Sequence, residues 1–206
     1  MLKIIIIGTS HISQKSIKAA QQAILTEKPD CVAVELCPAR YYALQTGRRK
    51  FSLKAGLIGA IFYLLQQWLG KKTGVLPGAE MLTAIRAAKA VNAKIVLIDI
   101  DIQTTLKKIK QIPLSEKLNL ISKLFFAPIS VKCINIAEVP EKKVIKEVMH
   151  WMRKSLPSFY KVLVTDRNKY MVDWILKLSK KFKKIVVVVG AGHETGIKRA
   201  LKRKIK

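Results

Sequence analysis

The chain alternates between short, uninterrupted apolar runs and longer segments whose apolar positions repeat with helical spacing. Uninterrupted runs of β-branched residues are typical of strands that pack against helices on both faces. Four such runs predict strands, at residues 2–7, 31–36, 95–98 and 185–189. The spacing also predicts a helix after Ser13 and a second one over residues 80–91. Strands that alternate with helices favour the α/β class, with a mostly parallel sheet and helices on both faces.

The length of the chain favours one domain. Its 206 residues, half of them hydrophobic, are enough for one sizeable core, so we predict a single α/β domain over residues 1–206. Residues 48–75 and 104–180 have mainly helical patterns, and the second segment forms a large helical insertion in the middle of the fold. Residues 198–206 form a basic tail.

The longest apolar stretch, residues 56–70, contains two glutamines and is shorter than the roughly 20 residues that a membrane-spanning helix needs. We therefore expect no membrane-spanning helix in this chain. The apolar residues of this stretch recur near helical spacing, so they either join the core or form an exposed patch. We favour the patch, which would form a homodimer.

Charge is the outlier of the composition, with 39 Lys and Arg against 13 Asp and Glu and a formal net charge of +26. This excess indicates either a generally solvated basic surface or attraction to an anionic partner, a lipid surface or a nucleic acid. The aromatic residues do not interleave with the basic ones as stacking platforms would, so we do not expect specific nucleic-acid recognition.

Each predicted strand ends in polar residues, and parallel strands place these ends on one edge of the sheet, where ligands bind in open α/β folds. His11 and His193 each follow a strand with the spacing Gly-x-x-His. The glycine lets the chain turn sharply in a loop, so that the imidazole can point back over the edge. The two residues are either a pair of metal ligands or ordinary histidines near helix starts.

Acidic residues are scarce, so their positions are informative. Glu35 lies in the second predicted strand, Asp99 and Asp101 follow the third, and Glu80 opens a helix. A carboxylate inside an apolar strand needs a partner, because burying it alone is costly. Catalysis and a structural ion pair explain Glu35 equally well. The arginines considered as its partner are Arg40, Arg86 and Arg167.

Six ordered blocks resemble the TraB/PrgY family, which is related to the Tiki and GumN proteins. They run from roughly residue 4 to residue 200 and comprise Gly8–His11, Pro29-Asp30 with Val34–Arg40, Pro77–Met81, Leu97–Ile102, Asp166–Met171 and Val189–His193. Two positions depart from the family pattern, since Ile100 stands where we expect arginine and Asn168 where we expect an acidic residue.

The resemblance implies a metal-dependent peptide hydrolase of the Tiki type, acting on signalling peptides as PrgY-type members act on peptide pheromones. The positions that match the metal ligands, for Mn, Co or Zn, are His11, His193 and Glu35. We expect Glu80 to act as general base and Arg40 or Arg167 to stabilise the oxyanion. We expect Asp99, Asp101 and Asp166 to contact the residues of this site without binding the ion themselves.

A second hypothesis uses the same edge without catalysis, as a module that binds a peptide or a membrane partner. Family members usually continue into a membrane-spanning region, so the resemblance implies a location on the cytoplasmic side, next to a membrane. Anionic headgroups would attract the basic chain there. The three cysteines have no CxxC spacing, which agrees with a reducing compartment.

Overall fold

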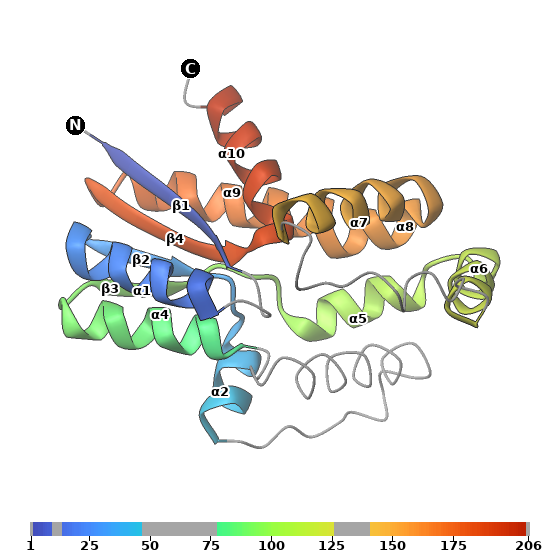
Figure 1. The fold of residues 1–206 in the computed structure, drawn as a ribbon, viewed down its shortest axis with the longest axis horizontal. Helices are drawn as coiled ribbons and strands as arrows, with labels where there is room; N and C mark the ends of the chain where they lie inside the picture. Colours follow the sequence, from blue (N-terminus) through green and yellow to red (C-terminus); the bar gives the residue numbers. More distant parts are fainter. Residues whose placement is uncertain (1, 10–13, 47–77, 126–140, 205–206) are drawn as a thin grey trace.

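The computed structural model describes residues 2–9, 14–46, 78–125 and 141–204, and these residues contain one four-stranded sheet (Figure 1). Its strands are parallel and lie in the order β1-β4-β2-β3. Their bounds are β1 Lys3–Thr9, β2 Cys31–Val34, β3 Lys94–Leu97 and β4 Lys184–Gly190. Every strand overlaps the apolar run that predicted it, so the α/β class and the parallel sheet are confirmed.

The last strand of the chain, β4, lies between the first two. Thr9 at the end of β1 pairs with Gly190 at the end of β4, and β2 pairs with the other side of β4. The residues 185–189 of β4 are fully buried, whereas β1 at the sheet edge is mostly half-buried. A strand that is apolar on both faces is best placed in the centre of a sheet. Because Thr9 pairs with Gly190, the first and last strands of the chain end side by side.

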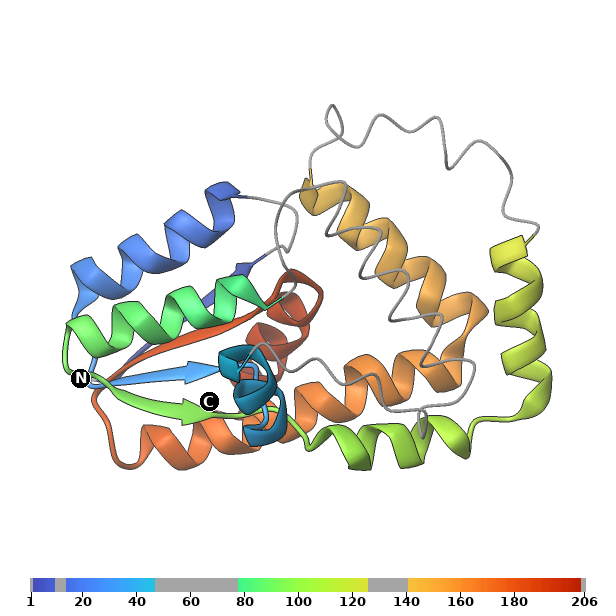
Figure 2. The same cartoon turned by 90° about the horizontal axis from the view of Figure 1, so that it is seen from below.

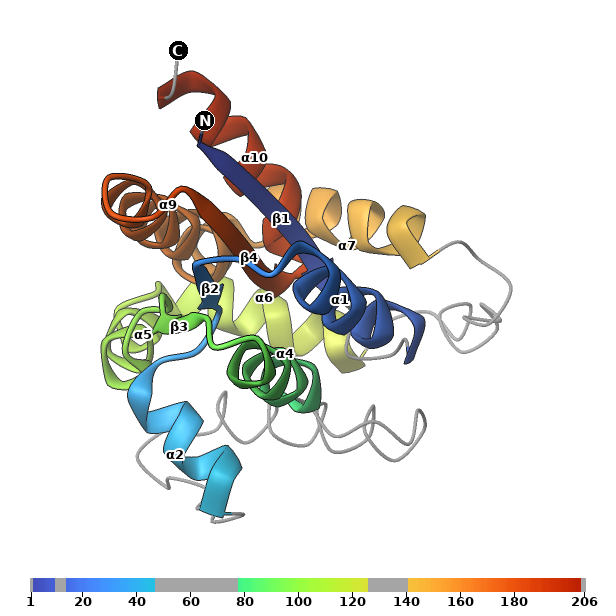
Figure 3. The ribbon, with the colours of Figure 1, turned by 90° about the vertical axis from the view of Figure 1, so that its left-hand side faces the viewer.

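Two pairs of helices cover the two faces of the sheet (Figure 3). The helices of one face are α1 (Gln14–Glu27) and α4 (Ala79–Ala90). The helices of the other face are α9 (Asp166–Ser179) and α10 (Ala191–Lys204). The predicted helices after Ser13 and over residues 80–91 correspond closely to α1 and α4.

Successive side chains of β2 point alternately to the two helix layers, and this alternation determines the layer into which Glu35, the residue after β2, points. Val32 and Val34 pack against α1 and α4, whereas Cys31 and Ala33 belong to the core beneath α9 and α10. The ladder continues for one residue, because the Glu35 N–H donates to the Val188 carbonyl at 3.0 Å. The Glu35 side chain therefore points into the layer formed by α9 and α10.

The helices of the central part of the chain lie beyond the carboxyl ends of the strands (Figure 2). They pack around a second small core that includes Phe159 and Leu156. In chain order they are α5 (Ile102–Lys110), α6 (Leu114–Phe125), α7 (Glu141–Ser155), α8 (Pro157–Tyr160) and the π-helical turn η3 (Lys161–Thr165), which leads into α9. The short helix α2 (Pro38–Thr46) follows β2.

Several sequence predictions concern residues that the structure does not describe. Residues 48–75 and the apolar stretch proposed for a homodimer lie outside the described residues, as does His11. Most of the predicted basic tail belongs to α10, which continues to Lys204. Within the described ranges, none of the helices combines the length and the apolar character needed to span a membrane.

Candidate metal and catalytic site

Four polar side chains converge at the carboxyl edge of the sheet, beneath α9 and α10. Glu35 follows β2 and Asp99 follows β3, while Arg167 and His193 lie in the first turns of α9 and α10. β4 ends at Gly190 and α10 begins at Ala191, so the expected loop around His193 is the first turn of a helix. All four side chains are candidates from the sequence alone, and the fold brings them into contact from four different elements.

Arg167 occupies the centre of this group and uses all five of its N–H donors. Its Nε and Nη2 donate to the two carboxylate oxygens of Asp99, each at 2.9 Å. Nη2 also donates to Glu35 Oε1. Nη1 donates to the Leu163 carbonyl at 3.3 Å and lies 3.1 Å from His193 Nε2. The guanidinium therefore joins two carboxylates, one imidazole and the backbone.

The turn before α9 supplies one of these partners. Helices α8, η3 and α9 follow one another without a break from Pro157 to Ser179. A π-helical turn holds one more residue than an α-helical turn, which changes the direction of the side chains that follow it, and such turns are frequent at functional sites. Leu163 lies in η3 and offers its carbonyl to Arg167. The π turn thus helps to aim Arg167 at the edge of the sheet.

The hydrogen bonds of His193 define its tautomer. A guanidinium can only donate, so the Nε2 atom that faces Arg167 carries the lone pair. Nδ1 then carries the hydrogen and donates to Asn168 Oδ1 at 2.7 Å. Burial, with the nearby Arg167 charge, lowers the pKa of His193 despite the opposing carboxylates, which agrees with a neutral ring. In the sequence, Asn168 stands out only as a departure from the family pattern, and its contact with His193 was not predicted.

Glu35 is held in its charged form. Burial alone would raise the pKa of its carboxyl, but His193, Arg167 and the Gly190 N–H outweigh burial and lower the pKa to about 2. The Gly190 N–H donates to Glu35 Oε2 at 2.7 Å. Because His193 is itself neutral, we attribute most of the stabilisation to the Arg167 cation and the backbone N–H. The pKa of Arg167 is raised, because Glu35 and Asp99 outweigh its burial.

Arg40 is the more accessible of the two arginines. Its side chain is 35% exposed, against 15% for Arg167. In the described part of the chain, its Nη1 forms an ion pair with Asp99 Oδ2 at 3.4 Å. With Glu35 and Asp99 on one side and Arg167 and Arg40 on the other, the formal charges of the group balance.

Glu80 reaches the same edge of the sheet from the opposite layer. It lies in the first turn of α4, is buried, and accepts a hydrogen bond from the Gly78 N–H at 3.1 Å. Gly78 has φ +94°, a left-handed conformation that favours glycine. The contacts that link Arg167 to Glu35, Asp99 and His193 do not include Glu80.

The two remaining aspartates named from the sequence have partners outside this group. Asp101 is the N-cap of α5, and its Oδ1 accepts the Gln103 N–H at 2.8 Å. Asp166, in the first turn of α9, forms an ion pair with Lys108 of α5. Neither takes part in the hydrogen bonds of Arg167.

A divalent ion would need at least three protein donors in a site of this kind. Among the described residues, no group of three His, Cys, Asp or Glu side chains can hold one. Two donors do match, because His193 Nε2 and Glu35 Oε1 lie 3.4 Å apart. Two ligands of a tetrahedral ion bound at about 2.0–2.1 Å are roughly 3.3 Å apart. The pair fits in chemistry and spacing, and a third ligand has to come from outside the described residues, where His11 lies.

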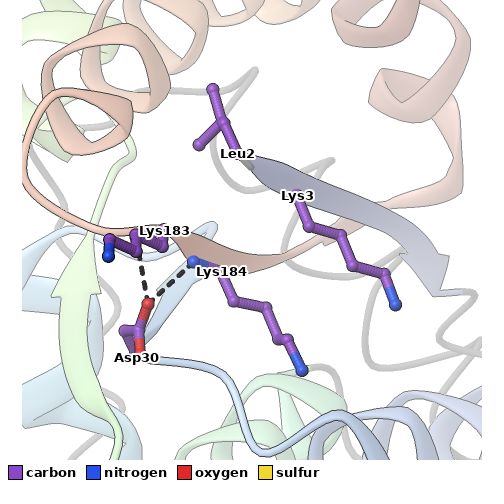
Figure 4. Close-up of a pocket in the computed structure, with 5 residues that line it drawn as sticks. All are labelled: Leu2, Lys3, Asp30, Lys183 and Lys184. Atoms are coloured by element: carbon purple, nitrogen blue, oxygen red, sulfur yellow. Dashed lines mark hydrogen bonds between the residues drawn. The ribbon is translucent and has the colours of Figure 1, made fainter.

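A surface hollow of about 530 Å³ lies at the opposite, amino-terminal edge of the sheet (Figure 4). Its Asp30 carboxylate accepts the backbone N–H groups of Lys183 and Lys184. Figure 4 shows that the Lys183 side chain points away from those of Lys3 and Lys184. The charged groups do not converge on a common point, so we do not regard this hollow as a catalytic site.

Comparison with known proteins identifies the family to which the chain belongs. A sequence model of the TraB/PrgY/gumN family matches residues 2–205. An uncharacterized protein of Methanocaldococcus jannaschii is 34% identical over 97% of this chain and 53% of its own length. TraB domain-containing proteins of Bos taurus and Homo sapiens are each 23% identical over 96% of this chain and 62% of their own length. The chain thus spans little more than half the length of these relatives, and it belongs to the TraB/PrgY/gumN family.

Proposed function

We propose that this chain is a metal-dependent peptide hydrolase. The observation that carries the proposal is the pair formed by the neutral His193 Nε2 and the ionised Glu35 Oε1, 3.4 Å apart at the carboxyl edge of a parallel sheet. This is the edge where α/β folds bind ligands. In this proposal His193, Glu35 and His11 hold Mn, Co or Zn.

The ion would polarise the scissile carbonyl and make water a nucleophile near neutral pH. The other residues then have separate tasks. Glu80 accepts the proton of the attacking water, and Arg40 stabilises the negative charge that develops on the carbonyl oxygen. Of the two arginines considered for that task, Arg167 is less suitable, because all five of its N–H groups already have acceptors. Asp99 holds both guanidinium groups in place.

The substrate class rests on the family. We propose peptides, including signalling peptides, because the resemblance to PrgY-type members points to them. The exposed fraction of Arg40 supports a substrate that approaches from that side of the edge.

Peptide cleavage with controlled metal content tests this function. The purified chain is incubated with a mixture of unstructured peptides, and products are identified by mass spectrometry before chelation, after chelation, and after addition of Mn, Co or Zn. Cleavage should stop on chelation and return with one of the metals. Glu80→Gln should lower kcat by about 10²–10⁴-fold, the usual range for a general base. Asp173→Asn, which changes a carboxylate exposed on α9, serves as a control. Cleavage at the full rate without metal would overturn the proposal.

A non-catalytic binding module is the second candidate. The balanced charges of Glu35, Asp99, Arg167 and Arg40 favour it, because a charge-neutral group has no need of an added cation. This candidate predicts stoichiometric binding of a peptide without cleaved product, and binding that is unaffected by Glu80→Gln.

A further inference from the structure

Arg167 contacts both donor atoms that the described residues supply to the proposed metal site. Its Nη2 donates to Glu35 Oε1, and its Nη1 lies 3.1 Å from His193 Nε2. These are the two donors whose 3.4 Å separation matches a tetrahedral ion. A lone pair that accepts a hydrogen bond from a guanidinium cannot bind a metal ion at the same time. His193 Nε2 has a single lone pair, so the guanidinium and the ion are alternative occupants of that atom, and at Glu35 Oε1 the two cations would compete for one carboxylate charge.

The charges of the group lead to the same conclusion. Glu35 and Asp99 have side chains that are 8% and 3% exposed, and Arg167 and Arg40 balance them. A divalent ion added to this group would leave a net positive charge in a nearly water-free place, where uncompensated charge is costly. If Arg167 moves away from Glu35 and His193 as the ion binds, much of that cost is avoided.

The attachment of Arg167 allows such a movement. Asp99 accepts hydrogen bonds from Nε and Nη2, and Asp99 is not among the proposed metal ligands. It can retain the guanidinium after Glu35 and His193 have been released. The Leu163 carbonyl and the Asn168 contact to His193 come from the same η3–α9 segment, so the position of Arg167 and the orientation of the imidazole are set together.

We propose that Arg167 is a positioning residue that acts as the resident cation of this site: it holds Glu35 Oε1 and His193 Nε2 in place, and a divalent ion must displace it. The inference rests on the proposed metal site. It adds that the affinity of the site for metal is set by competition with an internal guanidinium. When a guanidinium occupies the donors for at least about nine-tenths of the time, the apparent affinity for the ion falls by about tenfold or more.

The test measures the affinity of the full chain for Zn and Mn by isothermal titration calorimetry, in wild type, Arg167→Met and Arg40→Met. Both substitutions remove one positive charge beside Asp99, but only Arg167 contacts the two donor atoms. Arg167→Met should bind metal about tenfold tighter or more, and Arg40→Met should show a clearly smaller gain. Circular dichroism verifies the fold of each variant.

A second variant covers the case in which Arg167→Met does not fold. Arg167→Lys keeps the positive charge but has three donors on one nitrogen, so it cannot contact Asp99, Glu35 and His193 together in the same geometry. Its metal affinity should also exceed that of wild type, by a smaller factor.

The outcomes separate this inference from the proposed function. If wild type binds metal and the Arg167 variants bind it no more tightly, the competition is refuted while the metal site stands. If only the Arg167 variants bind metal, the competition is supported and the metal dependence of the wild-type chain is refuted. Equal gains in the Arg167 and Arg40 variants would show a general effect of charge and overturn the competition. If no variant binds metal, both proposals fall.

Discussion

At the scale of single residues, the site is organised by one arginine and by what it fixes in its neighbours. Arg167 keeps Glu35 ionised and faces the lone pair of His193. Asn168, the next residue of α9, accepts the hydrogen on the other ring nitrogen of His193. Two consecutive residues of one helix therefore determine the charge of the carboxylate and the tautomer of the imidazole.

The tautomer of His193 can be measured directly. Nitrogen NMR of the imidazole rings should show His193 with its hydrogen on Nδ1, because Asn168 Oδ1 accepts it. Asn168→Leu removes the acceptor and leaves Arg167 alone to favour the Nδ1–H form, so a fraction of the rings should shift to the Nε2–H form, whereas Asn168→Asp keeps an acceptor and should preserve Nδ1–H. The exposed His150 of α7 is the internal control and should not change. An unchanged spectrum of His193 in Asn168→Leu would mean that Asn168 does not set the tautomer.

The lowered pKa of Glu35 predicts how stability depends on acid. Its pKa is about 2 in the folded protein against an ordinary value of 4.5. A carboxyl with a lowered folded-state pKa stabilises the fold above its unfolded pKa, and this contribution is lost as the pH falls through the folded value. The urea concentration at the unfolding midpoint should therefore decrease as the pH is lowered from 4.5 to about 2.

Glu35→Gln separates this contribution from other acid effects. The variant should be less stable at neutral pH by about 3 kcal/mol or more, because the buried Arg167 loses a charged partner. Its urea midpoint should also depend less on pH in the acid range. Asp173→Asn, on the surface of α9, should retain the wild-type dependence. If Glu35→Gln and wild type had the same acid slope, the assignment of the low pKa to Glu35 would be wrong.

At the scale of elements, the close approach of α9 and α10 brings Asn168 to His193. Gly196 of α10 makes this approach possible, since a Cβ there would lie 2.3 Å from Asn168 Nδ2. Gly192, one turn earlier, has more room, because its Cβ would lie 3.1 Å from the end of the flexible Met149 side chain. The two glycines offer a matched comparison within one helix.

Gly196→Ala should therefore disturb the site, and Gly192→Ala should not. Both substitutions gain helix propensity of up to about 1 kcal/mol. Overpacking against Asn168 should make Gly196→Ala roughly 1–3 kcal/mol less stable than Gly192→Ala in urea unfolding. It should also weaken the Nδ1–H signal of His193. Equal stability of the two variants would contradict the proposed packing of α10 against α9.

Much of this architecture could be predicted from local pattern, and some could not. The uninterrupted apolar runs predicted four parallel strands, and polar residues at their ends predicted the edge that gathers Glu35, Asp99 and His193. The order of the strands requires tertiary information, because a local pattern does not show that β4 separates β1 from β2. The contact of Asn168 with His193 depends on helix packing and on the π turn, and neither has a clear signal in the sequence.

At the scale of the whole molecule, the two edges of the sheet have different characters. The carboxyl edge holds the group of Glu35, Asp99, Arg40 and Arg167, in which the formal charges balance. At the amino edge, Lys3, Lys94 and Lys184 are the first residues of three of the four strands. The basic residues of α10 extend to Lys204 near the end of the chain, and Figure 1 shows this end on the same side as the N-terminus. We propose that the amino edge faces an anionic membrane surface, so that the proposed site points away from it.

Vesicle binding tests this orientation. Co-sedimentation with anionic vesicles should weaken roughly thirtyfold in Lys94→Gln/Lys183→Gln, because each lysine near headgroups contributes about 1 kcal/mol. The matched double variant Lys107→Gln/Lys110→Gln removes the same charge from α5, beyond the carboxyl edge. It should bind vesicles almost as well as wild type. Equal losses in the two double variants would mean that the net charge, and not one face, determines binding.

We propose above all that the carboxyl edge holds a divalent ion through His193, Glu35 and His11. Elemental analysis of the purified chain, before and after incubation with Zn, Mn and Co, tests it most directly when paired with His11→Ala/His193→Ala. We expect about one ion per chain in the wild type, as for a single site with three protein ligands, and none in the double variant. If the wild type holds no ion after incubation, or if the double variant holds as much as the wild type, the metal site does not exist as proposed.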